Sequence, residues 1–154
     1  MLPAADKDPD MNAQRGYSAV IGTMPDWLLL ERAEPLSNLL CRLACAKDPI
    51  NDIEKRALII KAIGQLFGRP GMQFGSIIQK LYDCLTSLLS DYSIDFRGDV
   101  GSFIREAAMA SLCQLKYHLD EAQALKIQLE LLGQAVDRLD RVRWCSYELL
   151  SNFS

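Results

Sequence analysis

The chain has 154 residues, of which 49% are hydrophobic and 24% charged, close to an average soluble globular protein. Its net charge of −3 argues against a nucleic-acid partner, which would need clustered lysine and arginine. No apolar run approaches the roughly 20 residues that a membrane-spanning helix requires, and the opening MLPAADKDPD lacks the features of a secretory signal. We therefore expect a cytoplasmic protein with no membrane partner, a flexible acidic stub over residues 1–10 and one domain over residues 11–154.

Apolar residues recur with the period of a helix along most of the domain. Asp120, followed by Glu121, is the expected N-cap of one helix. No stretch shows sustained alternation with a period of two, so we expect no β-sheet and an all-α fold. In chain order, the apolar faces fall at residues 36–44, 59–67, 78–89, 104–115, 124–132 and 142–150. Breaks fall near residues 24–26, 47–49, 68–71, 95–98 and 117–120.

No constellation of residues points to catalysis. There is no phosphate-binding glycine motif, and the lone His118 has no nearby triad partners, so we interpret it as a turn residue. Five cysteines, an odd number, favour reduced and buried thiols. Cys41 and Cys45 could form half of a metal site, but a structural zinc needs four ligands and no further ligand has matching spacing, so core thiols are favoured. We expect a protein that is not an enzyme and that uses no metal or cofactor.

Arginines open several of the predicted helices at a regular interval. Arg15, Arg56, Arg105 and Arg143 are separated by 41, 49 and 38 residues, and the residues three and seven positions after each one share a helix face. This interval is typical of helical-hairpin repeats. The pattern therefore predicts a HEAT- or armadillo-like α-solenoid of about three to four antiparallel helical hairpins.

Two of these arginines have an aspartate six residues before them. Asp99 precedes Arg105, and Asp137 precedes Arg143, by this spacing, whereas the other two arginines have no aspartate at that position. The spacing resembles the HEAT signature, in which a turn aspartate and a second-helix arginine form a ladder along the stack. We therefore expect Asp99, Arg105, Asp137 and Arg143 to form a structural repeat ladder, with the carboxylates accepting hydrogen bonds from guanidinium groups.

Three stretches resemble the tubulin-folding cofactor D family, which is also called tubulin-specific chaperone D. The longest is DYSIDFRGDVGSFIREAAMASL, at residues 91–112, and it is the most specific. The shorter stretches are RGYSAVIGTMP at residues 15–25 and DRVR at residues 140–143. Members of the family are several times longer than this chain, so the resemblance implies that the chain corresponds to a short HEAT-repeat portion.

The resemblance implies a function, which the spacing of the arginines and aspartates alone does not predict. Proteins of this family are cytoplasmic chaperones that capture β-tubulin and help to assemble and take apart the αβ-tubulin dimer. Their partners are tubulin cofactors E and C and an Arf-like small GTPase, and their location can be at microtubules or the centrosome. The alternative is a generic HEAT or armadillo adaptor unrelated to tubulin. Neither reading assigns the residues that bind partners.

Some features have both a functional and a structural interpretation. Arg97-Gly98-Asp99 is the tripeptide of adhesion ligands, but we favour a glycine turn and a helix-capping aspartate. Trp27 and Trp144 could anchor an interface, but we expect them to pack in the core. Because the ends of a helical stack expose apolar faces, we also expect the isolated chain to self-associate or to be only marginally stable.

Overall fold

The computed structural model describes residues 23–47 and 53–153. The expected N-terminal stub and the first repeat, at Arg15, lie outside the described residues. The described part is almost entirely helical, so the all-α prediction is confirmed, and none of its helices is long and apolar enough to cross a membrane. The α-helices are α2 (Asp26–Cys45), α3 (Ile53–Phe67), α4 (Ile77–Leu88), α5 (Gly101–Gln114), α6 (Glu121–Gln134) and α7 (Asp140–Phe153), with a 3-10 helix η1 (Leu115–His118).

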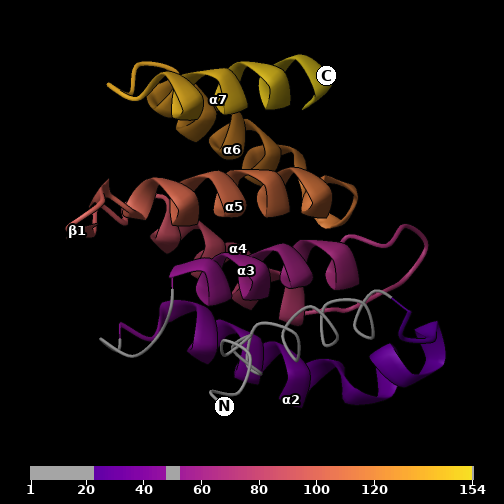
Figure 1. Cartoon of the computed structure of the whole chain (residues 1–154). Coiled ribbons are helices and arrows are strands. Elements are labelled where there is room, and N and C mark those ends of the chain that lie inside the picture. Colours follow the sequence, from indigo (N-terminus) through magenta and orange to yellow (C-terminus); the bar gives the residue numbers. More distant parts are fainter. Residues whose placement is uncertain (1–22, 48–52, 154) are drawn as a thin grey trace, which may run out of the picture.

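The six α-helices form three successive pairs that lie one above the other (Figure 1). Within each pair the first helix packs on the second: α2 on α3, α4 on α5, and α6 on α7. Between pairs, α3 packs against α5 and α5 packs against α7. Helix α5 is therefore covered on both sides, and its fully buried side chains include Ile104, Arg105, Met109 and Leu112.

The N-terminus of α6 forms as the sequence predicts. The side chain of Asp120 accepts a hydrogen bond from the Gln123 backbone N–H at 2.7 Å. In return, Gln123 Oε1 accepts the backbone N–H of Asp120 at 3.1 Å. This capping box satisfies two N–H groups that the first turn of a helix would otherwise leave unpaired. The prediction of Asp120 as an N-cap is confirmed.

A short β-hairpin between α4 and α5 was not expected from the sequence. Strand β1 (Ile94–Asp95) pairs antiparallel with β2 (Gly98–Asp99), with Ile94 opposite Asp99. Two-residue strands are too short to show the alternation that identifies a strand in sequence. Gly98 has a φ of 105°, a left-handed conformation that favours glycine and lets the chain reverse at this point.

The two tryptophans are exposed, so the expectation that they pack in the core is wrong. Trp27 on α2 is 66% exposed and Trp144 on α7 is 73% exposed. Each tryptophan lies two residues from a fully buried position, namely Leu29 in α2 and Val142 in α7. Two residues correspond to about 200° around a helix, so each tryptophan points away from the buried face.

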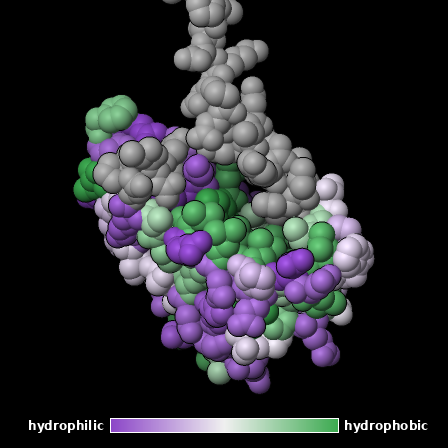
Figure 2. All heavy atoms as spheres, turned by 90° about the horizontal axis from the view of Figure 1, so that it is seen from below, coloured by the Kyte–Doolittle hydropathy of each residue, from purple (hydrophilic) through white to green (hydrophobic). Residues whose placement is uncertain are grey.

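The α2 side of the molecule also exposes apolar surface. Figure 2 shows this end, with hydrophobic residues gathered in the middle of the face and polar residues around them. The exposed large apolar side chains of α2 are Trp27, Leu30 and Leu39. Such a face is a candidate for contact with another molecule, and the self-association expected from the sequence stays a prediction.

The five cysteines are all free thiols, but they are not all in the core. Cys45 is exposed, because the adjacent Ala44 occupies the fully buried position in the last turn of α2. Cys45 Sγ lies 3.7 Å from Cys84 Sγ. Burial raises the pKa of Cys113 to about 12 and that of Cys145 to about 11. The expectation of buried thiols is therefore wrong for Cys45, and the other four thiols are only partly buried.

Helices α3 and α5 approach each other very closely at Gly64. A Cβ atom at this position would lie 2.8 Å from Ser111 Cα, which is backbone and cannot move aside independently. The hydroxyl of Ser111 donates to the carbonyl of Ile60 at 2.6 Å across the same interface. Gly64 therefore allows the close packing of the two pairs.

We predict that Gly64→Ala lowers the free energy of unfolding by about 1–3 kcal/mol, because the methyl group forces α3 and α5 apart. Gly133→Ala is the matched control, since nothing lies within 4 Å of a Cβ at this position. The control should be neutral or stabilise the chain by about 0.5–1 kcal/mol, because alanine is the better helix former. Urea unfolding followed by circular dichroism measures both. Equal stability of the two variants would contradict the close contact.

Candidate functional site: a buried arginine–aspartate cluster

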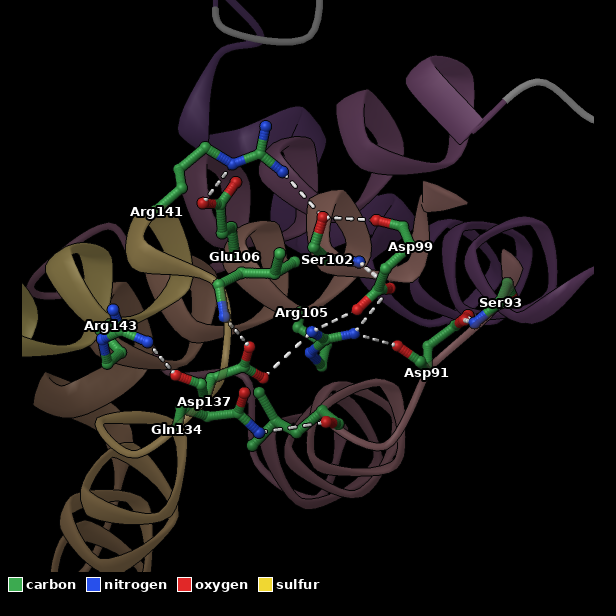
Figure 3. Close-up of polar contacts among 12 residues, drawn as sticks. Asp91, Ser93, Asp99, Ser102, Arg105, Glu106, Gln134, Asp137, Arg141 and Arg143 are labelled. Carbon is green, nitrogen blue, oxygen red and sulfur yellow. Dashed lines mark hydrogen bonds and ion pairs between the residues drawn. The ribbon is translucent and has the colours of Figure 1, made fainter. Parts of the chain in front are cut away.

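Arg105 lies at the centre of a buried polar cluster (Figure 3). Its Nη2 donates to Asp99 Oδ2 at 3.0 Å and to Asp137 Oδ2 at 3.1 Å. Its Nη1 donates to the backbone carbonyl of Asp91 at 2.8 Å. The guanidinium group also stacks over the ring of Tyr92 at 4.2 Å. Since the side chain is completely buried, its charge is compensated by these neighbours rather than by water.

Arg56 in α3 makes the same kind of contacts one pair earlier. Its Nη2 donates to Asp91 Oδ2 at 2.9 Å, and both side chains are only 3% exposed. Its Nε donates to the backbone carbonyl of Ala44 at 2.9 Å, at the end of α2. Arg56 therefore joins the pair α2–α3 to the turn of the pair α4–α5.

Asp91 and Asp137 are equivalent residues of their pairs. Each is the third residue after the first helix of its pair, α4 or α6. In each, Oδ1 accepts the backbone N–H two residues later, from Ser93 at 3.0 Å and from Leu139 at 2.8 Å. The other oxygen, Oδ2, accepts the arginine of the preceding pair. Each aspartate thus closes an Asx-turn and binds the neighbouring pair at the same time.

The equivalence of Asp91 and Asp137 differs from the one that the sequence suggested. Counting six residues back from the arginines makes Asp99 the counterpart of Asp137. The hydrogen bonds that each aspartate accepts from an arginine of the preceding pair instead make Asp91 the counterpart of Asp137. The β-hairpin lengthens the connection between α4 and α5, so Asp91 stands 14 residues before Arg105. Counting forward from the end of the first helix would have found Asp91, which the sequence analysis missed.

Asp99 is an additional ligand of Arg105 that the β-hairpin supplies. Its Oδ1 also accepts the backbone N–H of Ser102 at 3.1 Å in the first turn of α5. Its side chain is 8% exposed. The neighbouring Arg97 contacts Asp95 at 2.9 Å and Glu54 at 2.6 Å. The carboxylate of the Arg97-Gly98-Asp99 tripeptide is therefore engaged inside the molecule, as the structural interpretation expects.

Arg143 is the fourth residue of the predicted ladder, and it does not bind a carboxylate of the cluster. Its Nη1 donates to the backbone carbonyl of Asp137, and its Nη2 contacts the exposed side chain of Asp140 in the same helix. The structure therefore brings together Asp99, Arg105 and Asp137, and it leaves Arg143 at the side of the cluster, with 35% of its side chain exposed.

The electrostatics keep the carboxylates of the cluster charged. Hydrogen bonding to Arg105 is the main cause that lowers the pKa of Asp99. Burial would raise the pKa of Asp91, but hydrogen bonds from Ser93 and Arg56 outweigh it and the net pKa is lowered. Arg56 also contacts the last turn of α2 through the Ala44 carbonyl, where the helix dipole favours a cation. The cluster can hold helix pairs together through its ion pairs, although Arg105 Nε is buried without a hydrogen-bond partner.

A second feature is an open cavity of about 480 Å³ along the second helices α3, α5 and α7. Arg141 crosses it: its Nε donates to Glu106 Oε1 at 2.8 Å, and its guanidinium group lies 4.1 Å above the ring of Phe103. The lining combines apolar and charged side chains, among them Ala57, Lys61, Phe103, Glu106, Arg141 and Trp144. This mixture suits contact with a protein surface or peptide.

Metal binding finds no support in the described ranges, where no group of three His, Cys, Asp or Glu side chains is placed to hold an ion. His118 lies at the end of η1, where its Nε2 is 2.8 Å from the carbonyl of Arg69 and its ring stacks edge-on against Phe74. It thus contacts the connection between α3 and α4. No known family model and no solved structure matches the chain.

We predict that Arg105→Ala lowers the free energy of unfolding by about 3–5 kcal/mol, because it leaves the buried carboxylates of Asp99 and Asp137 without their cation. Arg97→Ala is the matched control, since Arg97 also contacts two carboxylates but is 39% exposed. Its loss should cost about 1 kcal/mol or less. Chemical denaturation measures both variants. Equal losses of unfolding free energy in the two variants would show that the buried ion pairs of Arg105 stabilise the chain no more than the exposed ion pairs of Arg97.

Proposed function

We propose that the chain is a non-enzymatic protein-binding scaffold, a HEAT- or armadillo-like solenoid that resembles part of tubulin-folding cofactor D. In this role it contributes to β-tubulin capture and to assembly and disassembly of the αβ-tubulin dimer. The observation that carries the proposal is the recurrence of one contact. Arg56 with Asp91, and Arg105 with Asp137, each join a second helix to the turn of the next helix pair.

The recurring contact supports a repeat architecture because the ion pair joins the same two atoms, Nη2 and Oδ2, at each step. Nη2 of the arginine binds Oδ2 of the next turn aspartate, while another guanidinium nitrogen binds a carbonyl near the end of the first helix of its own pair. A stack built in this way presents its second helices side by side. An extended surface of this kind can hold a protein partner without any chemical step.

The resemblance to cofactor D supports tubulin as the partner. The most specific stretch, residues 91–112, contains Asp91, Asp99 and Arg105, all of which belong to the buried cluster. The residues that carry the resemblance are thus also residues that hold the helix pairs together. By the same resemblance we propose tubulin cofactors E and C and an Arf-like small GTPase as further partners, and a cytoplasmic location near microtubules or the centrosome.

We assign partner contact to the open cavity along α3, α5 and α7. Phe103 and Trp144 are both exposed there, and Trp144 is the more exposed of the two. Exposed aromatic side chains next to an arginine are typical of residues that dominate binding energy at protein interfaces. Arg141 lies over Phe103 and extends this surface with a positive charge.

We predict that the immobilised chain retains purified αβ-tubulin and that Trp144→Ala weakens this binding about tenfold or more, as loss of a central aromatic anchor does. Trp27→Ala is the matched control, because Trp27 has similar exposure but belongs to α2, outside the cavity. It should leave the affinity unchanged. Surface plasmon resonance gives the dissociation constants.

Pull-down from cytosol separates the proposal from the generic adaptor. Recovery of tubulin, of cofactor E or C, or of the Arf-like GTPase supports the role in tubulin assembly. Failure to retain tubulin, together with specific recovery of an unrelated protein that depends on Trp144, would instead identify another adaptor of the same architecture.

A further inference from the structure

The second helices share a buried outward face, meaning the side that each turns toward the following pair. Its core is an arginine followed by apolar residues four and seven positions later. In α3 and α5 every one of these residues is at most 2% exposed, because the following pair covers it. The residues are Arg56, Ile60 and Ile63 in α3 and Arg105, Met109 and Leu112 in α5.

The corresponding face of α7 has the same pattern but is open. Its residues are Arg143, Tyr147 and Leu150, in the same spacing. Tyr147 is 55% exposed, whereas Met109, its equivalent in α5, is completely buried. A hollow of about 230 Å³ lies at this point, lined by Asp140, Arg143, Trp144 and Tyr147. Helix α7 therefore has the surface that in α3 and α5 receives another helix pair.

Helix α6 has a second exposed apolar row. Four exposed side chains, three on α6 and one just after it, recur at helical spacing on the side opposite the buried Ile127 and Leu131. A helix that is apolar on two opposite sides is suited to contact with neighbours on both. The exposed residues are Leu125, Leu129, Leu132 and Val136.

The hydrogen bonds of Arg143 are those expected of an arginine whose face has not yet been covered by a following helix pair. Like Arg105, it uses Nη1 to donate to a turn carbonyl of its own pair. In Arg56 and Arg105, Nη2 then binds the carboxylate of the next turn. In Arg143, Nη2 instead contacts Asp140, whose side chain is 82% exposed. Water screens an ion pair at such a position, so another carboxylate can replace Asp140 at little cost.

We propose that the face of α7 around Arg143 and Tyr147 docks a further helical hairpin, and that an aspartate in its inter-helix turn binds Nη2 of Arg143. The aspartate would occupy the third position after the first helix of the hairpin and close an Asx-turn, as Asp91 and Asp137 do. The hairpin would cover Tyr147 and Leu150 with apolar side chains. This inference does not depend on tubulin being the partner.

The described turns of a second copy of the chain are less suitable occupants. Among the described residues, the two inter-helix turns with the required geometry are those of Asp91 and Asp137. Their carboxylates already bind Arg56 and Arg105. A second copy that presented either of these two turns to α7 would have to break a buried pair to reach Arg143. The chemistry therefore favours a hairpin whose turn aspartate is not yet engaged.

The test uses the full chain extended after Phe153 by a second copy of residues 116–153, which continues the 38-residue spacing of Arg105 and Arg143. The appended segment supplies a hairpin with its own turn aspartate. A control chain contains Asp137→Asn in the appended copy only. We expect the aspartate form to melt about 5 °C or more above the asparagine form, as loss of a buried charged hydrogen bond requires. Both should melt as one cooperative unit in calorimetry.

The same pair of chains is then compared with Arg143→Met at the original position. The difference between aspartate and asparagine should disappear, because the donor is lost. The proposal is overturned if the asparagine form melts at the same temperature as the aspartate form while Arg143 is present. It is also overturned if the appended hairpin melts separately, or if sedimentation shows that the unextended chain forms a stable dimer that protects Tyr147. Tubulin binding plays no part in these outcomes.

Discussion

The completely buried guanidinium group of Arg105 determines how the helix pairs are held relative to one another. A cation without contact to water needs anionic partners, and the two that bind it come from separate connections, Asp99 before α5 and Asp137 before α7. Both connections are therefore fixed relative to α5. Arg56 applies the same constraint one pair earlier, through Asp91. The close contact of α3 with α5 at Gly64 then becomes a consequence of where these turns are held.

The helices were predictable from the sequence because each one has a continuous buried face. All six expected apolar faces fall within or next to an α-helix, and Asp120 caps α6 as expected. The exposed tryptophans were not predictable from apolar neighbours alone. Trp144 lies only two residues from the buried Val142, so its exposure depends on rotation around the helix axis. The β-hairpin was missed because two residues per strand leave no pattern.

The cluster was predictable where the connection between helices is short. Asp137 stands six residues before Arg143, and it does bind Arg105, its partner across the pairs. The longer connection with the β-hairpin displaced Asp91 from this spacing, so it was missed. Arg143 was expected in the ladder from its spacing alone. Its carboxylate contact is to Asp140 of its own helix, because none of the described turns offers it another one. The spacing in the sequence identifies which arginines and aspartates are candidates for the cluster. Which aspartate binds which arginine depends on the position of the neighbouring helix pair.

A double-mutant cycle between Arg105 and Asp137 measures how much this buried pair stabilises the stack of helix pairs. Arg105→Ala, Asp137→Ala and the double variant are unfolded in urea, and the coupling energy is the departure of the double variant from additivity. We expect a coupling energy of about 2 kcal/mol or more, because the pair is buried and joins two helix pairs. Additivity within about 0.5 kcal/mol would show that the two side chains do not stabilise each other, which would contradict the central claim.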